Sequence, residues 1–194
     1  VRQQLLFKDI DDKWVQIAAL SATSSQSVSL LNAVLQKFEP SVKAYESLVQ
    51  LLGGIIGKSQ NTAIIQGFLQ KAVTSDKQST WQAPLIEGLA QGLENRTSLP
   101  KDLWQERNLL IKASLEDSSN SIRQSSLHLL KVIGLPEGAQ TNVAMSKAIK
   151  MAGDAHLSQE LRAGAINFMA LRNPQQYELF LKKLISPQNP LPVQ

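Results

Sequence analysis

The stretch Ser121-Ile122-Arg123-Gln124-Ser125-Ser126-Leu127-His128-Leu129-Leu130 decides the predicted fold. At about 100° per residue, Ile122, Ser126 and Leu129 fall on one face of a helix. The pattern has an apolar residue first, a long polar residue second and small residues soon after. Similar starts occur at Val15-Gln16, Val42-Lys43, Trp81-Gln82 and Leu161-Arg162. One type of helix is therefore expected to recur along the chain.

The motif recurs with a nearly constant period. Its lead residues Val42, Trp81, Ile122 and Leu161 lie 39, 41 and 39 residues apart, and Val15 precedes Val42 by 27. Two helices in about 40 residues are typical of a HEAT-type helical solenoid. We therefore expect an all-α fold, a right-handed α-α superhelix of the HEAT/ARM type with about five helix pairs. The alternative is an ordinary helical bundle whose helices have similar lengths.

Polar segments and prolines divide the chain into successive helices. The expected helices cover residues 12–23, 27–38, 41 to between 53 and 58, 60–73, 81–93, 100–115, 120–133, 141–151, 158–169 and 173–185, after a helix end at 1–7. Each motif helix is expected to pair with the helix that follows it. No Pro/Gly/Ser-rich linker is long enough to separate two domains, so residues 1–194 are expected to form one repeat domain. Because the chain begins at Val1 and ends on Val193-Gln194, which look like the start of a motif, we expect an excised fragment of a longer protein.

Small side chains are expected to let neighbouring helices approach each other. The small residues of the motif are Ala18, Ala19, Ser125, Ser126, Ala163 and Gly164. Gly88 and Gly92 are four residues apart and share a helix face, which also favours close packing. Because a helix pair cannot bury both of its apolar faces alone, stacked pairs would bury a continuous core.

The composition fits a folded helical protein and excludes several kinds of chemistry. Hydrophobic residues make up 43% of the chain and aromatic residues only 5%, so the core is aliphatic. The absence of cysteine excludes disulfides, thiolate metal sites and covalent haem attachment within this segment. No apolar run approaches the roughly 20 residues that cross a bilayer, so we expect no membrane insertion.

The charge of the chain is mildly basic, with a net charge of +4 and a pI near 9.4. Lysines and arginines are scattered, and their longest run is Lys182-Lys183. A nucleic-acid binder usually concentrates such residues on one face. The scattered charge therefore argues against nucleic acid as the partner.

Three segments carry a resemblance to a known group of proteins. They are Asp12-Lys13-Trp14-Val15-Gln16-Ile17-Ala18-Ala19-Leu20, Trp81-Gln82-Ala83-Pro84-Leu85-Ile86-Glu87-Gly88-Leu89 and residues 187–194. The chain resembles, over most of its length, the HEAT-like region of modular bacterial membrane-bound dehydrogenase or haem-binding proteins. In that family a β-propeller precedes this region and a c-type cytochrome domain follows it. The resemblance implies an extracytoplasmic docking segment between other domains. It carries over no haem ligand or catalytic residue, because the family's Cys-x-x-Cys-His motif has no counterpart here.

The segment Gly53-Gly54-Ile55-Ile56-Gly57-Lys58-Ser59 imitates a phosphate-binding loop. Such a loop needs its first glycine five residues before the second and follows a strand. Leu52 occupies that position here, and the preceding residues have helical spacing. We therefore expect a helix end whose glycines permit close packing and a turn.

The two histidines do not form a metal-site pattern. His128 lies away from the apolar face of its helix and is expected to be solvated. His156 lies in a loop beside Asp154, and these two residues alone make a weak site. We therefore predict no catalytic, cofactor-binding or metal-binding residue in this chain.

The tryptophans and two motif arginines leave alternatives open. Trp14, Trp81 and Trp104 are either exposed interface anchors or packing residues at repeat junctions, and the second is favoured. Arg123 and Arg162 occupy equivalent motif positions. They could form a ladder of charges with acids such as Asp117 or Glu160, bind a ligand, or make hydrogen bonds between repeats, which is the favoured interpretation.

The sequence predicts a non-catalytic scaffold that docks a protein or a neighbouring domain of the same chain. The alternative is a nucleic-acid-binding HEAT-like domain of the kind found in alkylpurine DNA glycosylases. That alternative requires lysines and arginines to converge on one face, with an acid and a tryptophan beside them. A stand-alone enzyme is the third hypothesis and would need a pocket that holds His156, Asp154 and a lysine.

Overall fold

The computed structural model describes residues 2–21, 24–59, 61–75, 80–96, 99 and 103–194. These residues form eleven α-helices and two short 3-10 helices, and no strand occurs among them. The helices are α1 (Arg2–Lys8), α2 (Lys13–Leu20), α3 (Ser24–Gln36), α4 (Lys43–Lys58), α5 (Thr62–Thr74), α6 (Gln82–Glu94), α7 (Trp104–Glu116), α8 (Asn120–Ile133), α9 (Ala139–Gly153), α10 (Gln159–Met169), η1 (Pro174–Tyr177), α11 (Glu178–Leu184) and η2 (Leu191–Val193). The prediction of an all-α fold is confirmed.

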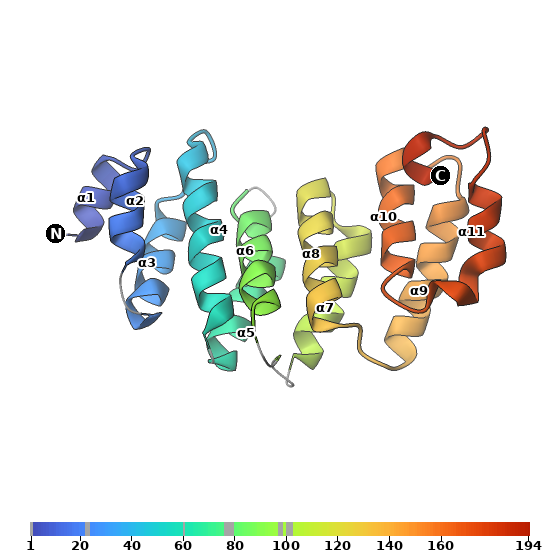
Figure 1. The fold of residues 1–194 in the computed structure, drawn as a ribbon, viewed down its shortest axis with the longest axis horizontal. Helices are drawn as coiled ribbons and strands as arrows, with labels where there is room; N and C mark the ends of the chain where they lie inside the picture. Colours follow the sequence, from blue (N-terminus) through green and yellow to red (C-terminus); the bar gives the residue numbers. More distant parts are fainter. Residues whose placement is uncertain (1, 22–23, 60, 76–79, 97–98, 100–102) are drawn as a thin grey trace. The chain divides into compact units, whose positions relative to one another are not determined.

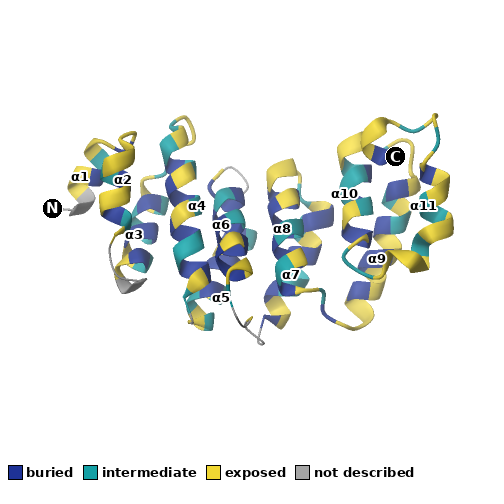
Figure 2. Cartoon of the chain, in the orientation of Figure 1, coloured by how far each residue is buried: buried dark blue, intermediate teal, exposed yellow. Residues whose placement is uncertain are grey.

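The contacts of the chain gather into two compact units. The first unit is Val1–Asp102, with α1 to α6, and the second is Leu103–Gln194, with α7 to α11. Each unit has its own buried aliphatic residues, and Figure 2 colours the cartoon dark blue at every buried residue. The prediction of one continuous repeat domain remains a prediction.

Within each unit, a motif helix packs against the helix in front of it in the sequence. Helix α4 packs on α3, α8 on α7 and α10 on α9, and Figure 1 shows the last two pairs side by side. The prediction that a motif helix pairs with the helix that follows it is therefore wrong. The motif marks the second helix of each pair, because its polar residue bonds to the segment that connects the pair.

That polar residue is buried at four motif positions, which are Gln16, Gln82, Arg123 and Arg162. The Gln16 amide donates to the carbonyl oxygen of Ile10 at 2.7 Å, and the Gln82 amide donates to that of Ser75 at 3.2 Å. Arg123 donates to the carbonyl oxygens of Asp117 at 2.7 Å and Ser118 at 3.2 Å. Each acceptor lies in the connection that joins the two helices of a pair. We call this contact the motif hydrogen bond.

Two further residues define the limits of the pattern. Gln194 holds the second position of the motif that begins at Val193, and its amide donates to the carbonyl oxygens of Ser186 at 3.0 Å and Asn189 at 2.7 Å. Lys43 holds the same position at the start of α4 and is exposed. A long side chain in this position therefore makes the bond only where it is an amide or a guanidinium group.

In the first unit, glycines bring α4 and α6 into backbone contact. A β-carbon added at Gly57 would lie 2.6 Å from the carbonyl oxygen of Leu89, and one at Gly53 would lie 3.0 Å from that of Leu85. On the other helix, a β-carbon at Gly88 would overlap the backbone of Gln50, and one at Gly92 the backbone of Gly54. The predicted close packing at Gly88 and Gly92 is confirmed.

The other small motif residues behave less uniformly. Ala19, Ser125 and Ser126 are buried, as expected for helices that approach closely. Ala18 is exposed, and a β-carbon at Gly164 would meet nothing within 4 Å. The expectation of a close approach at these two positions is wrong, because their helix faces point away from a neighbouring backbone.

Polar caps set where several helices begin, as the sequence predicts. Ser158 accepts a hydrogen bond from the backbone N–H of Leu161 at the start of α10. Gly134, with φ of 78°, ends α8 and donates to the carbonyl oxygen of Leu130. Asn173 also caps its helix, but the chain first forms the 3-10 turn η1 and becomes α-helical only at Glu178.

Gly88→Ala should lower the free energy of unfolding by about 1–3 kcal/mol, because its methyl group has no space against the Gln50 backbone. Gly67→Ala is the matched control, since Gly67 is an exposed residue inside α5 with nothing within 4 Å. The control should gain about 0.5–1 kcal/mol from helix propensity. Urea unfolding followed by circular dichroism measures both changes, and equal stabilisation of the two variants would contradict the packing.

Arg123→Ala should lower the free energy of unfolding by about 1.5–3 kcal/mol, because it removes the charged donor of the hydrogen bonds to carbonyl groups in the α7–α8 connection. Arg123→Gln should cost clearly less, since glutamine makes the same bond at positions 16 and 82. Lys43→Ala, at the exposed second position of the motif at α4, is the control and should change stability by less than about 0.5 kcal/mol. Thermal and urea unfolding give the order of the three variants, and equal losses for alanine and glutamine would refute the role of the bond.

Candidate functional site

The three tryptophans divide between the two predicted roles. Trp81 is only 6% exposed and packs in the first unit, as expected for a packing residue. Trp14 and Trp104 are 78% and 52% exposed, so the favoured packing interpretation is wrong for them. Both exposed tryptophans lie in the first turn of a helix.

The two motif arginines do not form a ladder with carboxylates. Arg162 donates to the carbonyl oxygen of Ala152 at 3.0 Å and to the side-chain oxygen of Asn189 at 2.7 Å. The pKa of Glu160 is lowered mainly by its own backbone N–H and by the Ser158 hydroxyl, and the charge of Arg123 is a smaller cause. Both arginines make hydrogen bonds, as the favoured interpretation predicts, but Asp117, Ser118 and Ala152 belong to the same helix pair as the arginine that they accept from, so the expectation of bonds between repeats is wrong for these contacts.

The segment that imitates a phosphate-binding loop is helical through Lys58. Its glycines pack against α6, so their backbone N–H groups are committed to the helix rather than to an anion-binding loop. The close packing expected for these glycines is confirmed, while the expected turn begins only after Lys58.

The two histidines lie in different surroundings. His156 is exposed in the loop after α9, and its backbone N–H, not its imidazole ring, donates to the carboxylate of Asp154 at 2.9 Å. His128 is half-buried rather than fully solvated, and it is among the residues that line a hollow between α8 and α10.

This hollow, which we call the α8–α10 hollow, is the candidate functional site. It has a volume of about 470 Å³ and is lined by Gln124, Leu127, His128, Leu130, Lys131, Gly134, Asn167, Ala170 and Leu171. Its volume falls within the range of about 300–1,000 Å³ that is typical of ligand pockets. The lining residues recur at three- and four-residue intervals, so they form one stripe on each helix.

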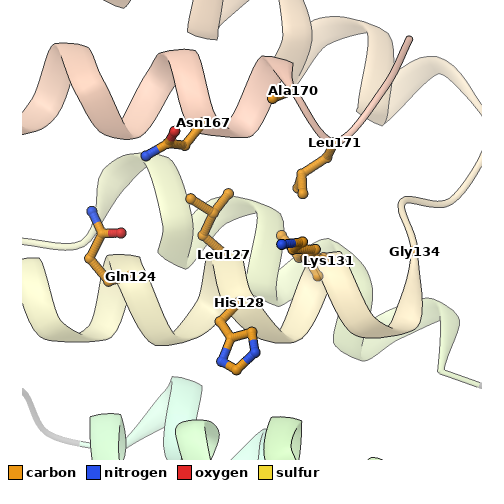
Figure 3. A pocket seen from close by; sticks show the side chains of 9 residues that line it. Gln124, Leu127, His128, Lys131, Gly134, Asn167, Ala170 and Leu171 are labelled. Atoms are coloured by element: carbon orange, nitrogen blue, oxygen red, sulfur yellow. The ribbon is translucent and has the colours of Figure 1, made fainter. Parts of the chain in front are cut away.

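Figure 3 shows how the lining side chains divide the hollow. Gln124 and Asn167 lie toward one end, whereas Lys131 and Leu171 lie toward the other. The ring of His128 lies on the side of α8 that faces away from α10. Leucine and alanine side chains form the remaining lining, so the hollow is apolar between an amide end and a cationic end.

The glycine contact of the first unit has no counterpart between α8 and α10. Counted from the motif lead residue, Phe168 of α10 and Arg172, three residues after the end of α10, take the positions that Gly88 and Gly92 hold in α6. Phe168 is fully buried. The hollow lies between two motif helices that lack glycines at these positions.

A second hollow lies between α7 and α9 in the same unit. It has a volume of about 670 Å³, and its lining includes Val143 and the charged residues Lys112, Glu116 and Lys147. Lys147 forms an ion pair with Glu116 at 2.6 Å. The hydrogen bond from Lys147 is the largest cause that lowers the pKa of Glu116. This hollow therefore holds one acid between two lysines, whereas the described lining of the α8–α10 hollow holds Lys131 and no acid.

Comparisons and searches give no further site. No protein-family model, curated protein or solved structure matches this chain. Among the described residues, no group of three or more histidines and acids could hold a metal ion. No helix in the described ranges is long and apolar enough to cross a membrane. The chain is an all-helical protein, and the α8–α10 hollow is the feature of its surface that suits a partner.

Exchange of Glu116 for Gln should lower stability by about 0.3–0.5 kcal/mol, since both partners of the pair are partly exposed. Because the folded-state pKa of Glu116 is lowered from 4.5, the contribution is present above that value and is lost as the pH falls through the folded pKa. A double-mutant cycle with Lys147→Met, measured at pH 7 and pH 3, checks this. Glu137→Gln is the control. A coupling energy between Glu116 and Lys147 that is the same at pH 3 as at pH 7 would contradict the role of the ion pair.

Proposed function

We propose that this chain is a HEAT-like, non-catalytic scaffold whose α8–α10 hollow docks a segment of another protein or of a neighbouring domain. The observation that carries the proposal is the hollow itself. It combines an apolar floor with amide groups and one lysine on two rigid helices. Such a surface suits a polypeptide, which offers apolar side chains and peptide groups together.

The helix pairs support the scaffold part of the proposal. In the second unit, α9 contacts α7 and α10 contacts α8, so one pair lies against the next. The motif lead residues follow a period of about 40 residues, and the polar motif residues repeat one bonding pattern. A right-handed α-α superhelix of the HEAT type is the arrangement that this pattern favours.

The placement of the reactive side chains supports a non-catalytic role. The buried arginines donate to backbone carbonyl groups, and Asp154 accepts from a backbone N–H rather than from an imidazole. A catalytic site would instead aim such groups at a shared pocket. Neither arginine is among the residues that line the two hollows.

Selection of a phage-displayed library of random twelve-residue peptides on the immobilised chain tests the proposal. The enriched peptides should lose binding to Ala170→Arg, whose long side chain fills the hollow, by about tenfold or more. Ala155→Arg, in an exposed loop outside the hollow, is the matched control and should bind normally. Enriched peptides that bind Ala170→Arg as well as the wild type would place docking elsewhere and overturn the assignment of this hollow.

A further inference from the structure

The α8–α10 hollow has a charge that its own lining does not balance. Lys131 is exposed at one end, and the lining residues that the structure describes include no aspartate or glutamate. The α7–α9 hollow contains two lysines, Lys112 and Lys147, and the acid in its described lining, Glu116, is paired with Lys147. An acidic group brought by a partner would therefore be complementary to the first hollow, whereas in the second it would be repelled by the carboxylate of Glu116.

The net charge of the second unit also favours an acidic partner. Residues 103–194 contain ten lysines and arginines against seven aspartates and glutamates, whereas residues 1–102 contain ten against nine. The excess of positive charge in the second unit attracts acidic segments over a distance of about one Debye length, roughly 10 Å at moderate salt.

The spacing of the lining sets the size of the occupant. Gln124 and Lys131 are seven residues apart on α8, which corresponds to about 10 Å along the helix axis. An extended chain covers that distance with about three residues. The apolar floor between these ends, formed by Leu127, Ala170 and Leu171, has room for an aliphatic side chain.

The amide end of the hollow suits a peptide backbone. Each carboxamide of Gln124 and Asn167 offers a donor and an acceptor, the same groups that a peptide unit presents. The lining contains no tryptophan, tyrosine or phenylalanine on which a nucleic-acid base could stack, and Lys131 is its only lysine among the described residues. A phosphate backbone is held by several cations and stacked bases by aromatic rings, so the lining favours protein over nucleic acid.

We propose that the α8–α10 hollow recognises a short acidic segment of a protein, with an aliphatic side chain on the leucine floor and an aspartate or glutamate beside Lys131. The inference rests on the proposed docking function and names the chemistry of the partner. The carboxylate lies about three residues from the part of the segment that meets Gln124 and Asn167.

Two defined peptide pools test this partner. The first contains random twelve-residue peptides built from Asp, Glu, Ser, Gly, Leu, Val and Ile, and in the second Lys and Arg replace the two acids. The immobilised wild-type chain should retain the acidic pool at least about fivefold better than the basic pool. Retention of the acidic pool should fall by about three- to tenfold in Lys131→Glu and should weaken as salt rises from about 0.05 to 0.5 M.

Lys150→Glu is the matched control, because it makes the same change of charge on an exposed residue of α9 that lines neither hollow. Circular dichroism and thermal unfolding establish that both variants are folded.

Equal retention of the two pools, or equal losses in Lys131→Glu and Lys150→Glu, would overturn the acidic partner while leaving peptide docking in place. The proposed function fails as well if neither pool is retained, or if Ala170→Arg retains the pools as well as the wild type does. Tighter binding of a labelled single-stranded oligonucleotide than of the acidic pool, lost in Lys131→Glu, would overturn the inference in favour of nucleic acid.

Discussion

The carbonyl groups at the carboxyl end of a helix have no partner within that helix, and in a packed helix pair they need donors from elsewhere. This chain supplies the donor from the second residue of four motifs, at the start of the next helix, while Lys43 of the motif at α4 is exposed. Gln16, Gln82, Arg123 and Arg162 all donate to the connection in front of them or to the end of the preceding helix. An arginine is well suited to this place, because its positive charge also faces the negative end of the helix dipole.

The same bond explains why the motif has its order of residues. The apolar lead residue is directed to the core, the next residue reaches back to the connection, and small residues such as Ser125 and Ser126 lie one turn later on the packed side. The bond fixes how the two helices of a pair meet, and the packing between pairs is left to other residues. The packing between pairs differs between the two units. Glycines bring α4 and α6 into backbone contact, whereas α8 and α10 have no such glycine contact. The hollow that we assign to docking lies between α8 and α10.

Much of the secondary structure could be predicted from the sequence, because caps and prolines act locally. The expected helix 120–133 coincides with α8, and Gly134 ends it as predicted. The pairing of helices could not be predicted in the same way, since a two-helix period is equally compatible with a partner before or after the motif helix. The acceptor of the Arg123 side chain decides between the two, and that acceptor is a backbone carbonyl, which leaves no mark on residue identity.

The candidate site could not be predicted from the sequence, for a related reason. Gln124, Lys131 and Asn167 look like ordinary surface residues, and only the distance between α8 and α10 makes them a site. A signal was nevertheless present, because the positions of Gly88 and Gly92 in α6 are taken by Phe168 in α10 and by Arg172 beyond its end. The exposure of Trp14 and Trp104 had no such signal, since a helix start is as compatible with a covered ring as with an open one.

The central claim is that one buried side chain ties the motif helices α2, α6, α8 and α10 to the helix before each of them, and hydrogen exchange tests it most directly. Arg162 connects the start of α10 to the end of α9, so Arg162→Met should reduce amide protection in both α9 and α10, with α8 less affected. A loss of protection confined to the first turn of α10, with α9 unchanged, would contradict the account.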